Sequence, residues 1–299
     1  MTKQRLKGNM ILMLMAFVWG MGFVAQSQGM ELIGPNTFNG LRMLIGSLVL
    51  LPIALLNRKK YSKTNTYSDK ALIKSGIICG IILCGASTIQ TYGLIYTTAG
   101  KSGFITAMYM IFVPIISIFL GKKITGKTFF CAIVALFGMY LLSMGGNSTE
   151  INFGDFLTLI CAILFSFHIL VIDHYSQKVE AIAFSCIQFF VCGIINIILM
   201  LVFEDFSYEI VKQCVYPILF SGIFACGVGY TLQPIGQRYA DPSVASIIMS
   251  LESVFAMLGG IVILSEIPLI TEIVGCIIMF AAIIVIQLPD NFLRFKRKI

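Results

Sequence analysis

Three ionisable side chains lie deep inside long apolar stretches of this 299-residue sequence: Arg42, His168 and Glu252. Hydrophobic residues make up 58% of the chain and charged residues only 12%, so few charges are available to be placed there. A charged side chain at the centre of a membrane helix costs about 2.5–3.5 kcal/mol on insertion scales unless it is paired, hydrated or neutralised. Each of the three therefore needs a partner or a function.

Glu252 is the clearest of the three because it falls near the centre of its apolar stretch. A carboxylate that faces a cavity would bind a cationic group or a proton. A protonated carboxyl that is hydrogen-bonded to a neighbouring helix would instead serve packing alone. The sequence leaves both interpretations open.

Arg42 and His168 also have two interpretations each. Arg42 lies roughly 10 Å from the start of its stretch at 1.5 Å per residue. It would meet an anionic substrate or, in the interpretation we favour, extend to the membrane interface beside Glu31. His168 would bond a substrate or relay a proton. A lone histidine on an apolar helix more often makes a satisfied interhelical hydrogen bond.

Aromatic and polar side chains in the other apolar stretches complete the candidate site. Such groups suit a cavity for amphipathic small molecules, although each one alone also fits a packing or interfacial role. Arg42 and Glu252 are the candidate charge or gating residues. The candidate substrate-binding residues are Trp19, Gln90, Tyr92, Thr106, Tyr109, Phe165, His168, Tyr230, Gln233 and Glu252.

Membrane-spanning helices would position these residues. A soluble domain is roughly 45–50% apolar and about 25% charged, which excludes a soluble globular protein here. A helix needs about 20 apolar residues to cross a bilayer. We therefore expect an all-α integral membrane protein with ten transmembrane helices. The ten apolar runs lie near 9–28, 36–57, 75–97, 102–120, 128–146, 153–173, 181–203, 213–235, 243–264 and 268–288.

The basic residues support this count. Lys and Arg stay on the cytoplasmic side of a membrane protein. With the N-terminus inside, ten spans place 18 of the 21 basic residues on that side, and the exceptions are Arg42, Lys101 and Lys212. We expect a multi-pass protein of the cell membrane with both termini in the cytoplasm. Nucleic-acid binding would require the basic residues on one face.

The second half of the sequence weakly repeats the first at a spacing of about 140–146 residues, as in Tyr96–Lys101 and Tyr239–Ser243. Residues 1–148 and 149–299 would each contribute five helices. An odd number of spans gives the two repeats opposite orientations, which is the inverted-repeat plan of many secondary transporters. In that plan the substrate binds between the repeats, near the midplane.

Two short enzyme-like matches lack the context they need. Gly100–Gly103 spells the GxSG of rhomboid proteases, but His168 is not in the glycine-rich helix that such a protease uses. Ala99–Ser102 ends like a P-loop, but the glycine spacing is wrong and no strand precedes it. The nine cysteines form no CxxC pair, so we interpret them as small buried residues. We expect no enzyme activity, no cofactor and no metal.

The stretch Tyr92–Thr106, which continues to Phe112–Ile115, resembles the fourth-helix signature of EamA-type transporters in the drug/metabolite transporter superfamily. Ser253 departs from the family, which often has a proline after the glutamate. The resemblance implies a ten-helix metabolite transporter, often an exporter, with cytoplasmic termini. Features similar to the same family occur in both halves: Trp19–Gly20, Arg42 after Pro35, Gln233–Arg238, Leu251–Glu252 and Glu266.

We therefore expect a secondary transporter that exports small metabolites, amino acids among them, by alternating access. It would work in the lipid bilayer as a monomer or homodimer. Alternatives on the same scaffold are an importer and a multidrug-efflux carrier. A membrane-embedded enzyme would need a convergent nucleophile, base and acid, and the sequence has only scattered single groups. A passive channel would more typically build pore-lining rings by oligomer symmetry.

Overall fold

The computed structural model describes residues 3–30, 32–62, 68–97, 99–143, 152–264 and 267–288. These ranges are helical and contain no strand. Within them, ten helical segments are long and apolar enough to cross a membrane, which confirms the predicted count. They are Lys3–Met30, Pro35–Arg58, Asp69–Gly93, Ser102–Phe119, Gly126–Ser143, Phe153–Ser176, Ala181–Phe203, Val215–Gln237, Pro242–Ile263 and Ile270–Gln287.

Three of these ten segments are interrupted and the other seven are single helices over the described residues. The single helices are α1 (Lys3–Met30), α2 (Pro35–Ser62), α3 (Asp69–Gly93), α6 (Gly126–Ser143), α7 (Phe153–Ser176), α8 (Ala181–Phe203) and α14 (Ile270–Gln287). The interrupted spans consist of α4 (Ala99–Ala107) with α5 (Tyr109–Phe119), of α10 (Val215–Phe220) with the π-helix η1 (Ser221–Tyr230) and α11 (Thr231–Gln237), and of α12 (Pro242–Met249) with α13 (Glu252–Leu264). A short helix, α9 (Tyr208–Gln213), precedes the eighth span.

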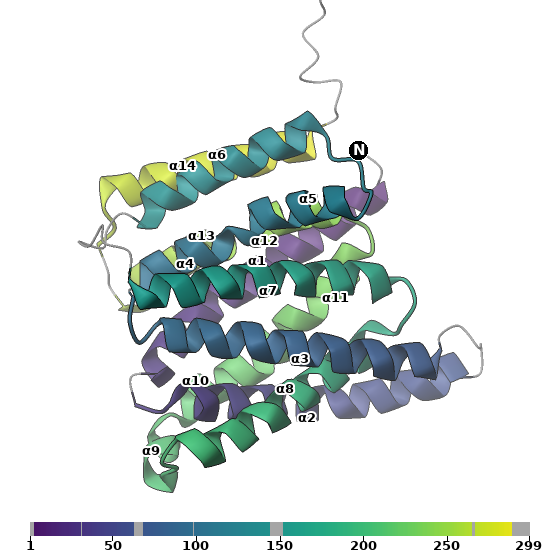
Figure 1. The fold of residues 1–299 in the computed structure, drawn as a ribbon, viewed down its shortest axis with the longest axis vertical. Coiled ribbons are helices and arrows are strands. Elements are labelled where there is room, and N and C mark those ends of the chain that lie inside the picture. The colour runs from purple at the N-terminus through teal and green to yellow at the C-terminus, as the bar shows by residue number, and fades with distance from the viewer. Residues whose placement is uncertain are drawn as a thin grey trace, which may run out of the picture.

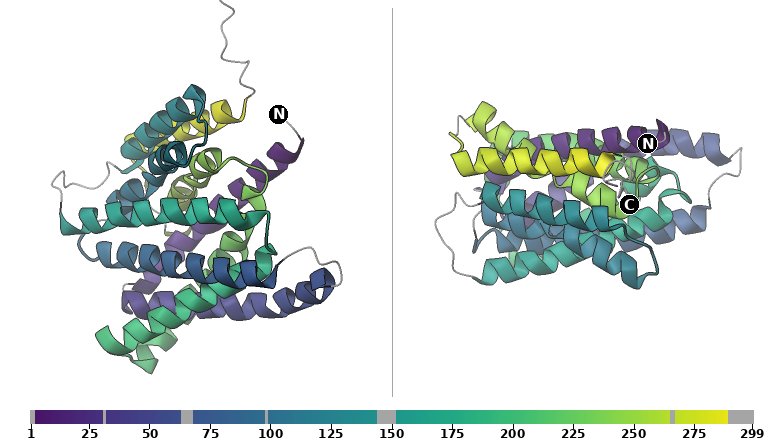
Figure 2. Two further views of the ribbon diagram at one scale, coloured as in Figure 1. Left: turned by 45° about the vertical axis from the view of Figure 1, so that its right-hand side comes forward. Right: turned by 90° about the horizontal axis from the view of Figure 1, so that it is seen from above.

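The spans lie side by side in one bundle (Figure 1). At one end α6 and α14 pack against each other, and at the other end α2 packs against α8, as both Figures 1 and 2 show. A Cβ added at Gly138 of α6 would lie 2.7 Å from the carbonyl oxygen of Gly275 in α14, so glycine permits this close approach. α1, α7 and the fourth and ninth spans lie in the middle of the bundle, and the eighth span runs beside α2 and α1.

The connections after α2, α5, α7 and α11 gather on the side where α1 begins, at the right of Figure 1. We call this the N-terminal side and the other the opposite side. The spans therefore run between two distinct sets of loops, one on each of these two sides. The basic residues that the sequence places on the cytoplasmic side, such as Lys122 and Arg238, belong to the N-terminal set of loops where the structure describes them.

The fourth and ninth spans are interrupted at corresponding places. A shift of 143 residues takes Ala99 to Pro242 and Tyr109 to Glu252, and these are the residues at which α4, α12, α5 and α13 begin. At both interruptions the backbone switches to hydrogen bonds that span three residues. Met108 N donates to Ile105 O at 3.1 Å, and Leu251 N donates to Ile248 O at 3.2 Å.

Proline explains the interruption of the fourth span. Pro114 lies inside α5 and cannot donate a backbone hydrogen bond. Its ring also crowds the carbonyl of Met110, four residues earlier. This crowding disturbs the helix in the residues that precede the proline in sequence. The turn at Met108 lies directly before this disturbed segment.

Serine explains the interruption of the ninth span. The Ser246 hydroxyl donates back to the Ser243 carbonyl at 2.9 Å, and the Ser250 hydroxyl donates to the Ile247 carbonyl at 2.8 Å. Such back-bonding competes with the helix and bends it. The ninth span is thus interrupted before Glu252. The residue after Glu252 is Ser253, and not the proline that EamA-type sequences often have there.

Candidate functional site

A cavity of about 50 Å³ lies where the middle helices meet. A single water needs about 10–15 Å³ of such space, so the cavity has room for roughly three to five waters. Both halves of the chain supply its wall, from α1, α2, α3, the fourth span, α7, η1 and α13. Its lining residues are Trp19, Gly22, Phe23, Gln26, Arg42, Gln90, Thr106, Tyr109, Phe165, Ala225, Tyr230 and Glu252.

Most of the residues singled out from the sequence meet at this cavity, although they are spread over seven spans. Four lining residues were not among them. Gln26 carries the same signal as Gln90, an amide within an apolar helix, and that signal would have found it. The predicted residues in the wall are Trp19, Arg42, Gln90, Thr106, Tyr109, Phe165, Tyr230 and Glu252.

Tyr92 and Gln233 lie away from the cavity wall. Asn36 Nδ2, at the start of α2, donates to Tyr92 Oη at 2.6 Å, so Tyr92 joins α3 to α2 near the opposite side. Gln233 is 1% exposed and lies on α11, beyond Tyr230 toward the N-terminal side. The structure does not bring these two together with the rest of the predicted site.

His168 stands behind the cavity and not in its wall. It is 1% exposed, and its Nε2 lies 3.1 Å from Gln188 Oε1 on α8. Its ring packs edge-on against Phe165 and Tyr230, with both centroid distances at 6.4 Å. The geometry is that of a satisfied interhelical hydrogen bond that supports two aromatic residues of the wall.

Glu252 sits at the interruption of the ninth span and is 7% exposed. Tyr109 Oη donates to Glu252 Oε1 at 3.1 Å, and the two residues are the first of α5 and α13. This hydrogen bond therefore joins the two interruptions, one from each half. Among the described residues, no lysine or arginine lies within ion-pair distance of the Glu252 carboxyl.

Arg42 is buried in the wall at 5% exposure, and its guanidinium does not extend to the interface. Its Nε donates to Asn39 Oδ1 at 3.0 Å and its Nη1 donates to Gln26 Oε1 at 3.1 Å. Both partners are neutral amides, and Arg42 pairs with no carboxylate in the part of the chain that the structure describes. Glu31, the partner suggested by the sequence, lies outside the described residues.

The aromatic part of the wall is fixed by the π-helix. Trp19 Nε1 donates to the Ala225 carbonyl at 3.2 Å, and its ring centroid lies 4.3 Å from that of Tyr230. A Cβ on Gly229 would lie 2.7 Å from Trp19 Nε1, so the glycine leaves room for the indole ring. π-helical segments are rare in proteins and frequently occur at functional sites. Here η1 presents a carbonyl and a tyrosine to the cavity.

The polar rim of the cavity is completed by Gln90, whose Nε2 donates to Thr106 Oγ1 at 3.1 Å. No group of three or more His, Cys, Asp or Glu able to hold a metal ion occurs within the described ranges. The nine cysteines all lie in these ranges and are buried and free. The arrangement therefore combines one guanidinium, one carboxyl, several amide and hydroxyl groups, and five aromatic side chains around a small space.

Comparisons with known proteins bear on the chain as a whole. The model of the EamA-like transporter family matches the chain twice, over residues 6–144 and 152–288. An uncharacterized transporter of Archaeoglobus fulgidus is 32% identical over 286 residues, which cover 95% of this chain and 87% of that protein. The uncharacterized transporter YoaV of Bacillus subtilis is 26% identical over 289 residues, which cover 94% and 96%.

A solved crystal structure shares the fold, with a TM-score of 0.81 at 16% sequence identity over 96% of this chain and 99% of that chain. The family and the names of the relatives indicate a transporter and not an enzyme. A transporter with ten membrane-spanning helices is a multi-pass membrane protein that works on a small-molecule substrate in a lipid bilayer. This chain belongs to the EamA-like transporter family.

Proposed function

We propose that this transporter exports small zwitterionic metabolites, amino acids among them, across the cytoplasmic membrane by alternating access. The observation that carries the proposal is the pair of ionisable groups in the cavity wall. Arg42 and Glu252 are both buried there, and each has only neutral hydrogen-bond partners among the described residues.

Burying an unpaired charge is costly, and a bound ion of opposite charge offsets that cost. A substrate carboxylate would accept charge-assisted hydrogen bonds from the Arg42 guanidinium, and a substrate ammonium would donate to the Glu252 carboxylate. A zwitterion satisfies both groups at once. Trp19, Phe165 and Tyr230 offer aromatic surface to an apolar side chain between the two charges.

The size of the cavity supports a carrier whose helices move. Space for a few waters does not admit a metabolite with both charged groups, so the wall must widen as the substrate enters. The interrupted fourth and ninth spans, joined through Tyr109 and Glu252, lie at the wall and provide places at which the helices can bend. Alternating access between two inverted repeats uses such discontinuous helices.

Two observations support the division into repeats of residues 1–148 and 149–299. The family model matches each half separately, and the helix starts of the fourth and ninth spans are related by one shift of 143 residues. The excess of lysine and arginine on the N-terminal side supports cytoplasmic termini. The direction of transport follows from the resemblance to exporters alone.

Counterflow in proteoliposomes tests the proposal. Vesicles loaded with an unlabelled amino acid are diluted into the radiolabelled one, and a panel of amino acids identifies the solutes that exchange. A carrier gives exchange that saturates with concentration and is accelerated by solute on the far side. Non-saturating flux without exchange would indicate a channel and would contradict the proposal.

A further inference from the structure

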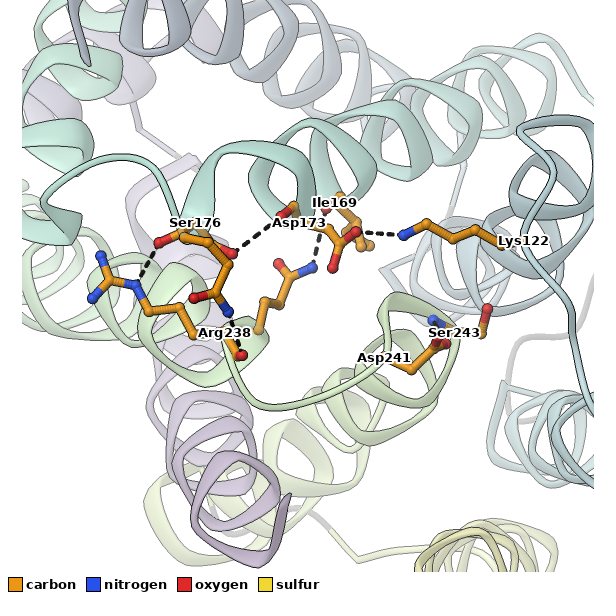
Figure 3. A network of polar contacts seen from close by, with 9 residues as sticks. Lys122, Ile169, Asp173, Ser176, Arg238, Asp241 and Ser243 are labelled. Atoms are coloured by element: carbon orange, nitrogen blue, oxygen red, sulfur yellow. Dashed lines mark hydrogen bonds and ion pairs between the residues drawn. The ribbon is translucent and has the colours of Figure 1, made fainter. Parts of the chain in front are cut away.

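A network of polar contacts lies on the N-terminal side of the molecule, away from the cavity (Figure 3). Lys122, in the loop after α5, forms an ion pair with Asp173 near the end of α7. The two side chains are 38% and 20% exposed, so the pair is partly buried. Lys122 belongs to the first half of the chain and Asp173 to the second.

The rest of this network lies within the second half. Arg238 donates from Nε to the Ser176 carbonyl and from Nη2 to the Val179 carbonyl, while Gln177 Nε2 donates to the Arg238 carbonyl at 2.6 Å. Gln237 Nε2 donates to the Ile169 carbonyl at 3.0 Å. These bonds hold the end of α11 against the end of α7 as one block. The Lys122–Asp173 pair joins this block to the first half (Figure 3).

On the helices that form this network or pack beside it, four buried polar atoms lack hydrogen-bond partners. They are Ser117 Oγ on α5, Gln233 Oε1 and Gln237 Oε1 on α11, and Ser243 Oγ on α12. Ser117 follows Tyr109 by eight residues, about 12 Å of helix, and α5 runs toward the N-terminal side. Ser243 precedes Glu252 by a similar distance on α12, which packs against α5.

Buried polar atoms without a hydrogen bond are rare in folded proteins because they lose water and gain nothing in return. Several of them on helices that meet at the N-terminal side are explained if that side is wet in another conformation. The four atoms come from both halves of the chain, on α5, α11 and α12, and these helices extend between the level of the cavity and the N-terminal side.

We propose that the Lys122–Asp173 ion pair is the latch of a gate on the N-terminal side, and that Ser117, Gln233, Gln237 and Ser243 line the water-filled path that forms when the latch separates. The inference rests on the alternating access proposed above. It needs no particular substrate, so it can be tested without one.

Thiol labelling of the purified full chain in detergent tests the gate. The native cysteines are buried, so the unmodified protein gives the background rate with a hydrophilic maleimide. We expect Ser243→Cys to react slowly, and Ser243→Cys combined with Lys122→Gln to react faster by a factor of about 1.4 to 5, the factor expected for the loss of one partly exposed ion pair. Equal rates with and without Lys122→Gln would overturn the proposal.

Two matched controls separate gating from general loosening. Arg58→Gln removes an ion pair on the same side whose side chains are 63% and 62% exposed, and it should leave the labelling of Ser243→Cys unchanged. Ser185→Cys places a thiol at a buried serine whose hydroxyl has no hydrogen-bond partner. This residue lies on α8, outside the network, so Lys122→Gln should not accelerate its labelling. Acceleration at this control site equal to that of Ser243→Cys would also overturn the proposal.

Charge reversal provides a second readout. Lys122→Asp alone places two carboxylates together and should speed the labelling of Ser243→Cys. Adding Asp173→Lys restores an ion pair and should return the slow rate. Fast labelling in this double reversal, with an unchanged melting temperature, would contradict the role of the pair as a latch. The readout is independent of transport, so its failure is distinguishable from failure of the proposed substrate class.

Discussion

Replacing Gly20 by alanine tests the contact that positions Glu252. A Cβ on Gly20 would lie 2.5 Å from Phe255 Cβ, 2.7 Å from the Glu252 carbonyl oxygen and 2.8 Å from Ala256 N. Two of these are backbone atoms that cannot rotate away. Contacts of a Cβ atom below 3.0 Å essentially never occur, so α1 and α13 must separate by about 0.5 Å to reach that limit and by about 0.9 Å to reach an ordinary contact of 3.4 Å.

The magnitude follows from a comparison with Gly85→Ala. Overpacking of this kind costs about 1–3 kcal/mol, while alanine stabilises a helix by about 1 kcal/mol relative to glycine. Around Gly85 the nearest atom is Leu164 Cδ1 at 3.5 Å, an ordinary contact, so only the helix gain applies there. We therefore expect Gly20→Ala to be about 1–3 kcal/mol less stable than Gly85→Ala.

Thermal unfolding of both variants in detergent measures this difference, and counterflow in proteoliposomes measures its effect on transport. Separation of α1 from α13 would also shift Glu252 relative to the α1 residues of the cavity wall, so Gly20→Ala should lose exchange activity while Gly85→Ala keeps it. Equal melting temperatures together with equal exchange in the two variants would refute the reasoning that this glycine contact holds the site together.

Three further substitutions probe the cavity wall and the opposite side. Arg42→Lys cannot reproduce two hydrogen bonds from a planar guanidinium, and it should lower counterflow at least tenfold, about 1.4 kcal/mol; exchange within a factor of two of wild type would contradict this. Tyr109→Phe removes a hydrogen bond to Glu252 and should cost about 0.6–1.7 kcal/mol in thermal unfolding, whereas an unchanged melting temperature would show that the bond contributes nothing. Glu204 accepts hydrogen bonds from two backbone N–H groups at the start of α2, at 2.7 and 2.9 Å. Glu204→Gln should therefore lower the stability measured by thermal unfolding by about 0.5–2 kcal/mol, as the loss of a helix cap does. A variant as stable as wild type would refute that role.

The helices could be predicted from the sequence because each span must provide about 20 apolar residues. The interruptions were harder to predict. Pro114 is visible as a helix breaker, but Ser246 and Ser250 have the spacing of a small-residue packing stripe. Their hydroxyls bend the ninth span only because they turn back to its own carbonyls.

The site could be predicted in part for a similar reason. Residue type identifies groups that are costly in lipid, which selected Glu252 and Arg42. Depth along the helix favoured an interfacial Arg42, since sequence position does not reveal which side chains of other helices are near. The amide of Gln26 on α1 keeps Arg42 in the cavity wall, because it accepts a hydrogen bond from the guanidinium. Tyr92 looks similar to the cavity tyrosines in sequence, but its face of α3 is directed to Asn36.

The central claim is that one cavity holds both charges of a small zwitterion between Arg42 and Glu252. Thermal unfolding with leucine, isopentylamine and 4-methylpentanoate tests it directly, because a ligand at 100 times its Kd stabilises the folded state by about 2.7 kcal/mol. We expect leucine to raise the melting temperature at concentrations at which neither analogue does, and we expect Arg42→Gln and Glu252→Gln each to abolish this preference. Equal stabilisation by the amine or the acid, or a preference for leucine that survives both substitutions, would contradict it.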